Sequence, residues 1–219
     1  QHATQVVCAA SSHFCTAERQ YRFPLEFGSQ RTPTAQWTVT GAGATLVSLQ
    51  PKAPPLAHIA RVCMGRVIDL GITDANNMGA AMAPAAADTL LALFTDTKTT
   101  PADYDLIVSG DLGQVGHDLL MQLMREQRIP LPDDRYTDCG LLIFDRKEQD
   151  THAGGSGCGC SASVLNGHLL PRLQRGELRR IIFMATGALM SLTSSQQGES
   201  IPGIAHAVVL ESPTGGSKS

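Results

Sequence analysis

Residues 154–160, GGSGCGC, contain the residue types most able to do chemistry in this chain. A glycine-rich turn that opens a helix can hold an anion on its backbone N–H groups, and its two cysteines could bind a metal or act as nucleophiles. Without a complete phosphate-binding motif the signal is weak, so a purely structural turn and an anion contact both stay open. We expect the glycines of this turn to supply positive φ angles.

The cysteine spacing favours reduced thiols over a zinc site or a disulfide framework. Only Cys158 and Cys160 stand close together among the six cysteines, and His152 could join them. Structural zinc sites usually use two such pairs, so this signature is weak and no metal ligands are assigned. Disulfide frameworks belong to small secreted chains. We expect Cys8, Cys63, Cys158 and Cys160 to be small core-facing residues.

Polar residues that follow predicted strands form a second group of candidates. Asp111 is the last residue of YDLIVSGD and follows its predicted strand. Residues at the ends of strands often contact the ligands of α/β folds. It could instead cap the following helix. His13, Glu18 and Arg19 follow the strand in QVVCAASS, where Glu18 and Arg19 could equally be solvated surface charges.

The composition limits the class of protein. The chain has 219 residues, 42% of them hydrophobic and 17% charged, with a net charge of −3. This balance excludes a nucleic-acid partner, which needs a basic surface, and excludes disorder, which needs low hydrophobicity. We expect no bilayer-spanning run and no signal peptide, and therefore a soluble protein with a real core.

Strand and helix patterns alternate along the chain, which predicts an α/β layered fold. QVVCAASS is predicted to be a buried strand, and TLVSL, IARVCMGRVI, YDLIVSGD, CGLLIFD, RRIIFMATGA and IAHAVVLES are the other predicted strands. The predicted helices are NNMGAAMAPAAADTLLALF, with Pro84 in its first turn, GHDLLMQLMREQ and most of SASVLNGHLLPRLQRG.

The distribution of strands predicts two unequal domains. Two clear strands precede the proline-rich PKAPP segment, and a two-stranded layer is not stable alone. We expect residues 1–50 to be the end of a first half, residues 51–57 a linker and residues 58–219 a second half. The sequence is thus interpreted as the later part of a longer chain, whose sheet should show an unpaired edge.

Seven blocks resemble one family: AASSHFCTAERQYRFPLEFG, WTVTGAGATLVSL, DLGITDANNMGAAMAPAAADT, YDLIVSGDLGQVG, AGGSGCGCSASV, MATGALMS and GESIPGIAHAVVLE. In this order they resemble the stage V sporulation protein AD family of the thiolase-like superfamily, which is related to ketoacyl-synthase III. The resemblance implies a layered αβαβα sandwich of two similar halves. The second half would be complete and the first only partly present, without the segment that carries the nucleophilic cysteine of the enzymes.

The same resemblance implies that catalytic groups have been lost. The related condensing enzymes place a histidine after the strand that matches DLIVSGDLG and an asparagine in the loop that matches AGGSGCGCSA. Gly110 stands at the first position, and Gly154 or Gly155 at the second. Glycine can neither donate nor accept a proton through a side chain, so the resemblance implies a binding protein derived from an enzyme.

The implied ligand is dipicolinic acid, with calcium as a possible companion and no other cofactor. The family role would be its uptake into the developing spore, beside other SpoVA proteins at the spore inner membrane, by a homodimer. The expected ligand-binding residues are Gly110, Asp111, Gly155, Ser156, Cys158, His13 and Arg19. Asp111, Ser156 and Cys158 are predicted to meet at one cavity, which Gly155→Val should block. The alternatives are an acyltransferase that uses a cysteine in the absent part, and a scaffold with a vestigial pocket.

Overall fold

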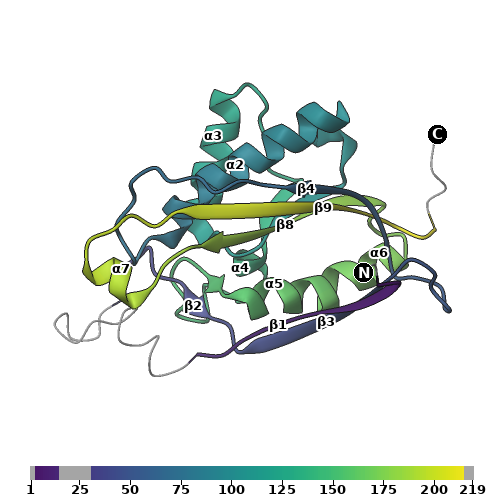
Figure 1. The fold of residues 1–219 in the computed structure, drawn as a ribbon, viewed down its shortest axis with the longest axis horizontal. Helices are drawn as coiled ribbons and strands as arrows, with labels where there is room; N and C mark the ends of the chain where they lie inside the picture. Colours follow the sequence, from purple (N-terminus) through teal and green to yellow (C-terminus); the bar gives the residue numbers. More distant parts are fainter. Residues whose placement is uncertain (1–2, 15–30, 215–219) are drawn as a thin grey trace.

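The computed structural model describes residues 3–14 and 31–214, which form a layered fold of helices and sheets (Figure 1). A five-stranded sheet at its centre has the strand order β4-β9-β8-β5-β6. β5 pairs in parallel with β6 and β8, whereas β9 pairs antiparallel with β8 and β4. In spatial order these strands are His58–Met64, Gly203–Glu211, Arg180–Ala188, Leu106–Ser109 and Tyr136–Asp138. The predicted α/β class is confirmed.

Helices α2 (Met78–Thr97) and α3 (Gly113–Glu126) cover one face of this sheet (Figure 1). The amphipathic pattern predicted for α3 is confirmed, because Leu120 and Met124 are fully buried against the sheet. Burial of aliphatic side chains between helix and sheet is the main favourable contribution to such a core. The largest fully buried members of this cluster are Leu90, Leu93, Tyr104, Ile107, Leu112, Leu120, Met124, Ile182 and Met184.

The start of α2 differs from the prediction. The helix begins at Met78, where the Asn77 side chain caps it by accepting a hydrogen bond from the Ala80 N–H at 3.3 Å. Pro84, predicted to lie in the first turn, lies inside the helix and cannot donate a backbone hydrogen bond there. Eleven residues of α2 are buried, and this burial outweighs the one missing bond.

One long helical segment covers the opposite face of the sheet. It consists of α5 (Cys158–Val164), the π-helical turn η3 (Leu165–Leu169) and α6 (Leu170–Gln174). The predicted helix over this stretch is confirmed. Its buried side chains form a second hydrophobic cluster with the sheet, which includes Val108, Val164, Leu169, Leu173, Ile181 and Phe183.

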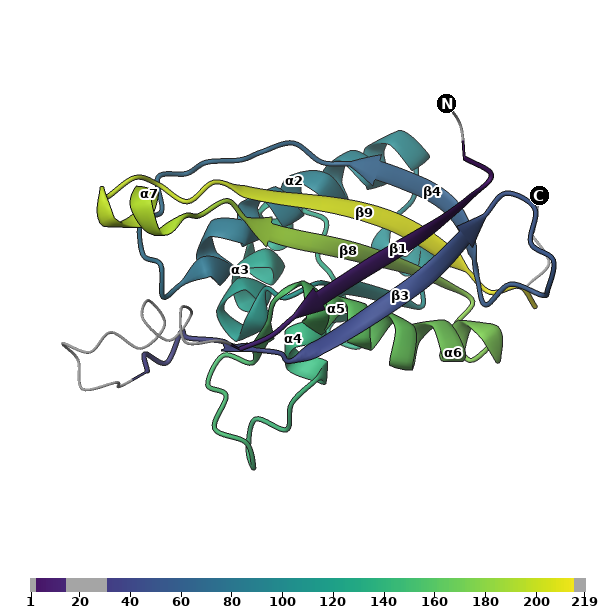
Figure 2. The same ribbon diagram turned by 60° about the horizontal axis from the view of Figure 1, so that its bottom comes forward.

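Strands β1 (Gln5–Ser12) and β3 (Gly41–Ser48) form a separate antiparallel pair beyond α5, so the layers run helix, sheet, helix, sheet (Figures 1 and 2). β1 was predicted to be buried, but most of it is exposed, with Val7 67% exposed. The reason is that β3 is its one strand partner among the described residues, and helix α5 lies against this pair. Cys8 is exposed for the same reason, so its predicted core position is wrong.

A short parallel pair connects the first fifty residues to the rest of the fold. β2 (Trp37–Thr38) pairs with β7 (Gly155–Ser156), directly before α5. The segment at residues 51–57 contains no strand or helix, in agreement with a linker. The predicted domain boundaries themselves stay a prediction.

The segment CGLLIFD was predicted to be a strand, but it begins with the short helix α4 (Cys139–Leu142). The Asp138 side chain caps this helix by accepting a hydrogen bond from the Gly140 N–H at 2.9 Å. An Asp at this position favours a helix start over continued strand. The remaining short helices are η2 (Pro101–Asp103) and α7 (Leu192–Gln196).

Helix α2 is long and apolar enough to cross a membrane by length and composition alone. The expectation that no stretch reaches this length is therefore wrong for residues 78–97. However, 61% of its most apolar window is buried inside the fold, because α2 lies against β8, β9 and α3. Its hydrophobicity is that of a core helix.

Candidate functional site

A cavity of about 540 Å³ lies at the N-terminal end of α5, with walls from β1, β3, β8 and the start of α2. Its lining is mainly apolar, which is typical of small-molecule sites. The apolar side chains include Ala10, Met78, Met82, Leu165, Phe183 and Ala185. The polar ones include Gln36, Asp111, Ser156, Cys158, Asn166 and Thr186.

Asp111 connects the loop after β5 to two other parts of the site. Its Oδ2 accepts a hydrogen bond from the Gly157 N–H at 2.7 Å, and its Oδ1 accepts one from the Thr186 hydroxyl at 2.9 Å. Asp111, Ser156 and Cys158 all line the cavity, so their predicted convergence is confirmed. The parallel pairing of β5 with β8 brings Asp111 next to Thr186 at one edge of the sheet. The turn that contains Ser156 and Cys158 is joined to Asp111 by the Gly157 N–H.

Gln36 was missed by the sequence analysis, although it lies between both loops. Its Nε2 donates hydrogen bonds to the backbone carbonyl oxygens of Asp111 at 2.9 Å and Gly155 at 2.8 Å. The residue reaches this place because the adjacent Trp37 pairs with Gly155 across β2 and β7. A lone glutamine in a loop has no pattern that would reveal such a contact.

The glycine-rich turn has the predicted positive φ angles at Gly154 (108°) and Gly157 (102°). Its N–H groups bind protein atoms: that of Gly157 donates to Asp111, and that of Gly159 donates to the Ser12 hydroxyl oxygen at 3.0 Å. The structural interpretation of this turn is therefore favoured over an anion contact.

The two cysteines of the turn lie in different environments. Cys160 is buried, as predicted, and burial raises the pKa of its thiol. Cys158 is exposed and lines the cavity, and its thiol donates to the Ser11 carbonyl oxygen at 2.8 Å. The predicted core position of Cys158 is wrong because, as the first residue of α5, it faces β1 rather than the sheet.

Gly110 and Gly155 lie behind the cavity wall and do not line it. A Cβ atom at Gly110 would lie 3.0 Å from Thr186 Oγ1, and one at Gly155 would lie 2.6 Å from Ile143 Cγ2. Both positions are thus packed against neighbouring residues. The prediction that Gly155→Val would block the cavity is wrong, because the new side chain would meet Ile143 and Val39 instead.

Two further predicted ligand residues are not brought to this cavity. His13 is exposed, and its Nδ1 lies 3.4 Å from the Thr40 hydroxyl oxygen. It is not among the residues that line the cavity. Arg19, like Glu18, lies outside the described residues.

The weak zinc signature has no counterpart in the described part of the chain. Residues 3–14 and 31–214 contain no group of three or more His, Cys, Asp or Glu side chains placed to hold a metal. His152 instead lies 2.7 Å from the Thr32 carbonyl oxygen and 3.1 Å from Asp150. The five cysteines that the structure describes are free thiols.

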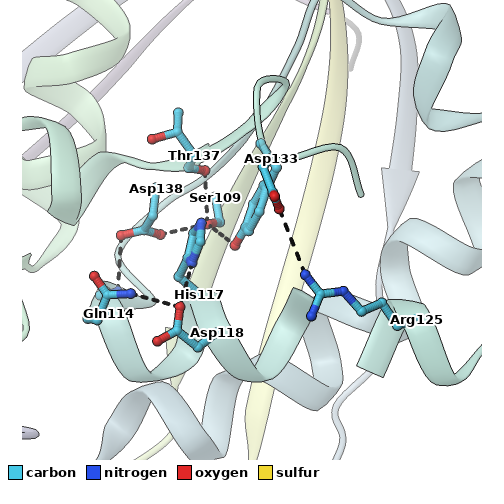
Figure 3. Close-up of polar contacts among 10 residues, drawn as sticks. Ser109, Gln114, His117, Asp118, Arg125, Asp133, Thr137 and Asp138 are labelled. Carbon is cyan, nitrogen blue, oxygen red and sulfur yellow. Dashed lines mark hydrogen bonds and ion pairs between the residues drawn. The ribbon is translucent and has the colours of Figure 1, made fainter. Parts of the chain in front are cut away.

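A buried polar cluster lies beside the cavity, at the ends of β5 and β6 (Figure 3). Asp138 is fully buried and accepts a hydrogen bond from the Ser109 hydroxyl at 2.6 Å. Burial raises the pKa of Asp138 to about 7, against the hydrogen bond from Ser109, and the nearby charge of Asp111 raises it further. The Ser109 hydroxyl oxygen also lies 2.9 Å from the Tyr136 hydroxyl oxygen, and the His117 ring stacks on Tyr136 at 4.6 Å. Apart from Asp111, none of these residues lines the cavity.

The overall fold of the chain is similar to that of solved condensing enzymes. AbyA1, a tetronic acid condensing enzyme, superposes with a TM-score of 0.54 at 16% identity, covering 95% of this chain and 60% of that chain. The ishigamide ketosynthase/chain length factor gives 0.53 at 15% identity, covering 95% and 49%. At these identities the likeness shows the fold alone. This is the predicted thiolase-like fold.

Sequence comparison defines the family. The model of the family "Stage V sporulation protein AD (SpoVAD)" matches residues 1–211 of this chain. Stage V sporulation protein AD of Bacillus subtilis (strain 168) is 47% identical over 215 residues, which is 98% of this chain and 62% of the relative. The chain therefore belongs to the stage V sporulation protein AD family, a family of sporulation proteins, as the resemblance predicted. It spans about three fifths of that relative's length.

Proposed function

We propose that this protein is a non-catalytic member of its family that binds dipicolinic acid together with calcium in the cavity at the start of α5. In this role it supports uptake of dipicolinate into the developing spore, as a homodimer beside SpoVA proteins at the inner membrane. The observation that best supports the ligand site is the cavity itself: its volume of about 540 Å³ is within the usual range for small-molecule sites.

The cavity wall supports binding rather than catalysis. Among the described residues that line it there is no histidine or lysine to serve as a general base. At Gly110, the position that matches the enzymes' histidine, a Cβ atom would already lie 3.0 Å from Thr186 Oγ1. Asp111 accepts hydrogen bonds on both carboxylate oxygens, so its geometry is that of a fixed group.

The charge of the wall favours a calcium chelate over free dipicolinate. Asp111 is the one carboxylate, and no Lys or Arg is present, among the described residues that line the cavity. A bare dicarboxylate would be repelled by Asp111, whereas calcium takes oxygen ligands from both carboxylates and carbonyls. The residues present therefore fit the chelate, with Asp111 beside the cation.

Isothermal titration calorimetry of the purified protein tests the proposal. Dipicolinate, calcium alone and calcium dipicolinate are titrated separately at constant ionic strength. We expect saturable binding of calcium dipicolinate and weaker binding of dipicolinate when calcium is chelated. Absence of binding with all three would leave the scaffold function. Absence of enzymatic activity alone would not distinguish a ligand-binding protein from a scaffold.

Replacing Asp111 with asparagine should change the calcium dependence while preserving the fold. An asparagine oxygen can still accept from the Gly157 N–H, and its amide can donate to the Thr186 hydroxyl oxygen, so both contacts survive without the charge. We expect the ratio of affinities with and without calcium to fall at least about tenfold, the effect of losing one strong charged contact of about 1.4 kcal/mol. Calorimetry with both ligand forms measures it, and an unchanged ratio would exclude Asp111 from the cation site.

Two glycine variants separate entry to the cavity from stability. Gly187 lines the cavity, and the one atom near a Cβ placed there is Ile204 Cγ2 at 3.5 Å. Gly187→Val should therefore fill part of the cavity and weaken binding with little change in stability. Gly155→Val should instead lower the free energy of unfolding by about 1–3 kcal/mol, because its side chain meets Ile143 and Val39. Denaturant unfolding and calorimetry are measured on both variants. Loss of affinity in Gly155→Val but not in Gly187→Val would contradict this assignment of the cavity wall.

Acyl transfer remains the second function, because condensing enzymes share the fold and Cys158 presents a thiol to the cavity. Incubation with acyl-CoA or acyl-carrier protein, followed by intact mass, separates it from binding. A stable acyl adduct together with turnover would replace the binding function with an enzymatic one.

A further inference from the structure

One buried carboxylate, that of Asp138, contacts the backbone beside both loops that form the cavity, the loop of Asp111 and the glycine-rich turn. Asp138 ends β6 and accepts four hydrogen bonds in all. Its Oδ2 accepts from the Ser109 hydroxyl at 2.6 Å and the Leu112 N–H at 2.9 Å. Its Oδ1 accepts from the Gly113 N–H at 3.0 Å and the Gly140 N–H at 2.9 Å. A carboxylate can accept all four because each oxygen has two lone pairs.

Two of these donors belong to the loop of Asp111. Leu112 and Gly113 are the next two residues, and Gly113 adopts a left-handed conformation with φ of 63°. A Cβ atom at Gly113 would lie 2.6 Å from Gln36 Nε2, so the chain is closely packed as it passes Gln36. The Asp138 carboxylate thereby fixes the peptide groups that follow Asp111 and determines where Asp111 meets the cavity.

The fourth donor connects Asp138 to the glycine-rich turn. The backbone at Gly140 touches that of the turn: a Cβ at Gly140 would lie 2.3 Å from the Gly155 carbonyl oxygen, and one at Gly154 would lie 2.5 Å from the Gly140 carbonyl oxygen. Since Asp138 holds the Gly140 N–H, it also fixes the surface on which the turn rests. It achieves this without lining the cavity.

We propose that Asp138 is a positioning residue of the ligand site, which sets the loop of Asp111 and the glycine-rich turn in the arrangement that binds ligand. The identity of the ligand rests on the proposed function, whereas the positioning of the two loops does not. Figure 3 shows that Asp138 approaches Ser109 from the neighbouring strand, within the cluster at the strand ends. Ser109 therefore provides a control within the same cluster.

Asp138→Asn and Ser109→Ala differ in which contacts they remove. In Asp138→Asn an amide NH₂ replaces one oxygen. Because NH₂ is a donor, it cannot accept the hydrogen bond from the Leu112 N–H, or else those from Gly113 and Gly140, depending on which oxygen it replaces. Ser109→Ala removes a hydroxyl from the same buried cluster but leaves the three backbone N–H groups bonded to Asp138. Both variants lower stability, but only the first releases the loops.

Calorimetry with calcium dipicolinate is carried out on both variants, at a temperature where circular dichroism shows each to be folded. We expect Kd to rise at least tenfold in Asp138→Asn with unchanged stoichiometry, and to stay within twofold of wild type in Ser109→Ala. A general loss of stability would lower the stoichiometry and leave Kd unchanged. An equal Kd in wild type and Asp138→Asn would overturn the proposal.

Hydrogen exchange gives a second readout that does not depend on the ligand. Peptides that span residues 110–116 and 154–158 should exchange at least tenfold faster in Asp138→Asn and at the wild-type rate in Ser109→Ala. Faster exchange with no binding by the wild type would retain the positioning role and refute the proposed ligand. Unchanged exchange in both peptides of Asp138→Asn would refute the positioning role itself.

Discussion

Replacing Gly116 with valine is expected to lower the free energy of unfolding by about 3 kcal/mol. Gly116 lies in α3 directly opposite Gly79 in α2, and a Cβ atom at Gly116 would lie 2.9 Å from both the Cα and the carbonyl oxygen of Gly79. These are backbone atoms, so no side chain can rotate away to make room. The two helices would have to move apart, which opens the buried contacts between them and the sheet.

Gly167→Val is the matched control, because Gly167 is also helical, is exposed and has no atom within 4 Å of a Cβ position. Valine and glycine differ by only a few tenths of a kcal/mol in helix propensity. We expect denaturant unfolding of Gly167→Val to match the wild type within about 0.5 kcal/mol. A similar midpoint for Gly116→Val would show that the two helices do not depend on this close approach.

The elements that could be predicted from the sequence are those with a clear local pattern. Leu120 and Met124 recur at helical spacing in α3, and both are fully buried. The apolar runs of β5, β8 and β9 have hydrophobic residues on both faces because helices cover both sides of this sheet. In these segments local sequence and tertiary packing favour the same structure.

The incorrect predictions occur where a distant or polar contact decides the structure. The residues after Asp138 are apolar enough for a strand, but its side chain caps a helix there. Pro84 would normally begin a helix, yet the burial of α2 extends the helix back to Met78. β1 is apolar and was taken as buried, but helix α5 covers only one face of the β1–β3 pair, and most of β1 is exposed.

At the candidate site, the place of a residue after a predicted strand indicated some of the residues that line the cavity. The contacts among these residues could not be predicted from the sequence. Asp111, Ser156 and Cys158 all line the cavity, and the hydrogen bond from the Gly157 N–H to Asp111 joins their two loops. Gln36 reaches the Asp111 carbonyl oxygen across 75 positions of sequence, and no local pattern encodes such a distance. The glycine pattern likewise could not show that Gly155 faces Ile143 rather than the cavity.

Asp138 is expected to make the protein less stable as pH rises from about 4 to about 7. Its pKa is raised to about 7 by burial and by the charge of Asp111, whereas an unfolded aspartate titrates near about 4. Between these values the folded state keeps a proton that the unfolded state has released, so the free energy of unfolding falls with pH. Three pH units at about 1.4 kcal/mol each give a loss of about 4 kcal/mol, complete above pH 7.

The groups around Asp138 support this direction. Asp111 faces it from the loop after β5, and Tyr136, Cys139 and Cys160 are coupled to it from β6, α4 and α5. Each of these groups is neutral or negative, so none favours the charged form of Asp138 through its own charge. The hydrogen bonds from Ser109 and the backbone oppose the shift but do not outweigh burial.

The measurement is the difference in the free energy of unfolding between wild type and Asp138→Asn, taken by denaturant unfolding from pH 4 to pH 8. Because asparagine does not titrate, this difference isolates the carboxyl group, and the advantage of the wild type should shrink as pH rises. Asp103→Asn is the control of opposite sign: hydrogen bonds from Thr100 lower the pKa of Asp103, so that carboxylate stabilises the fold above its unfolded pKa and loses this effect only as pH falls. A wild-type advantage over Asp138→Asn that stays constant from pH 4 to pH 8 would mean that Asp138 is ionised throughout, held by its four hydrogen bonds.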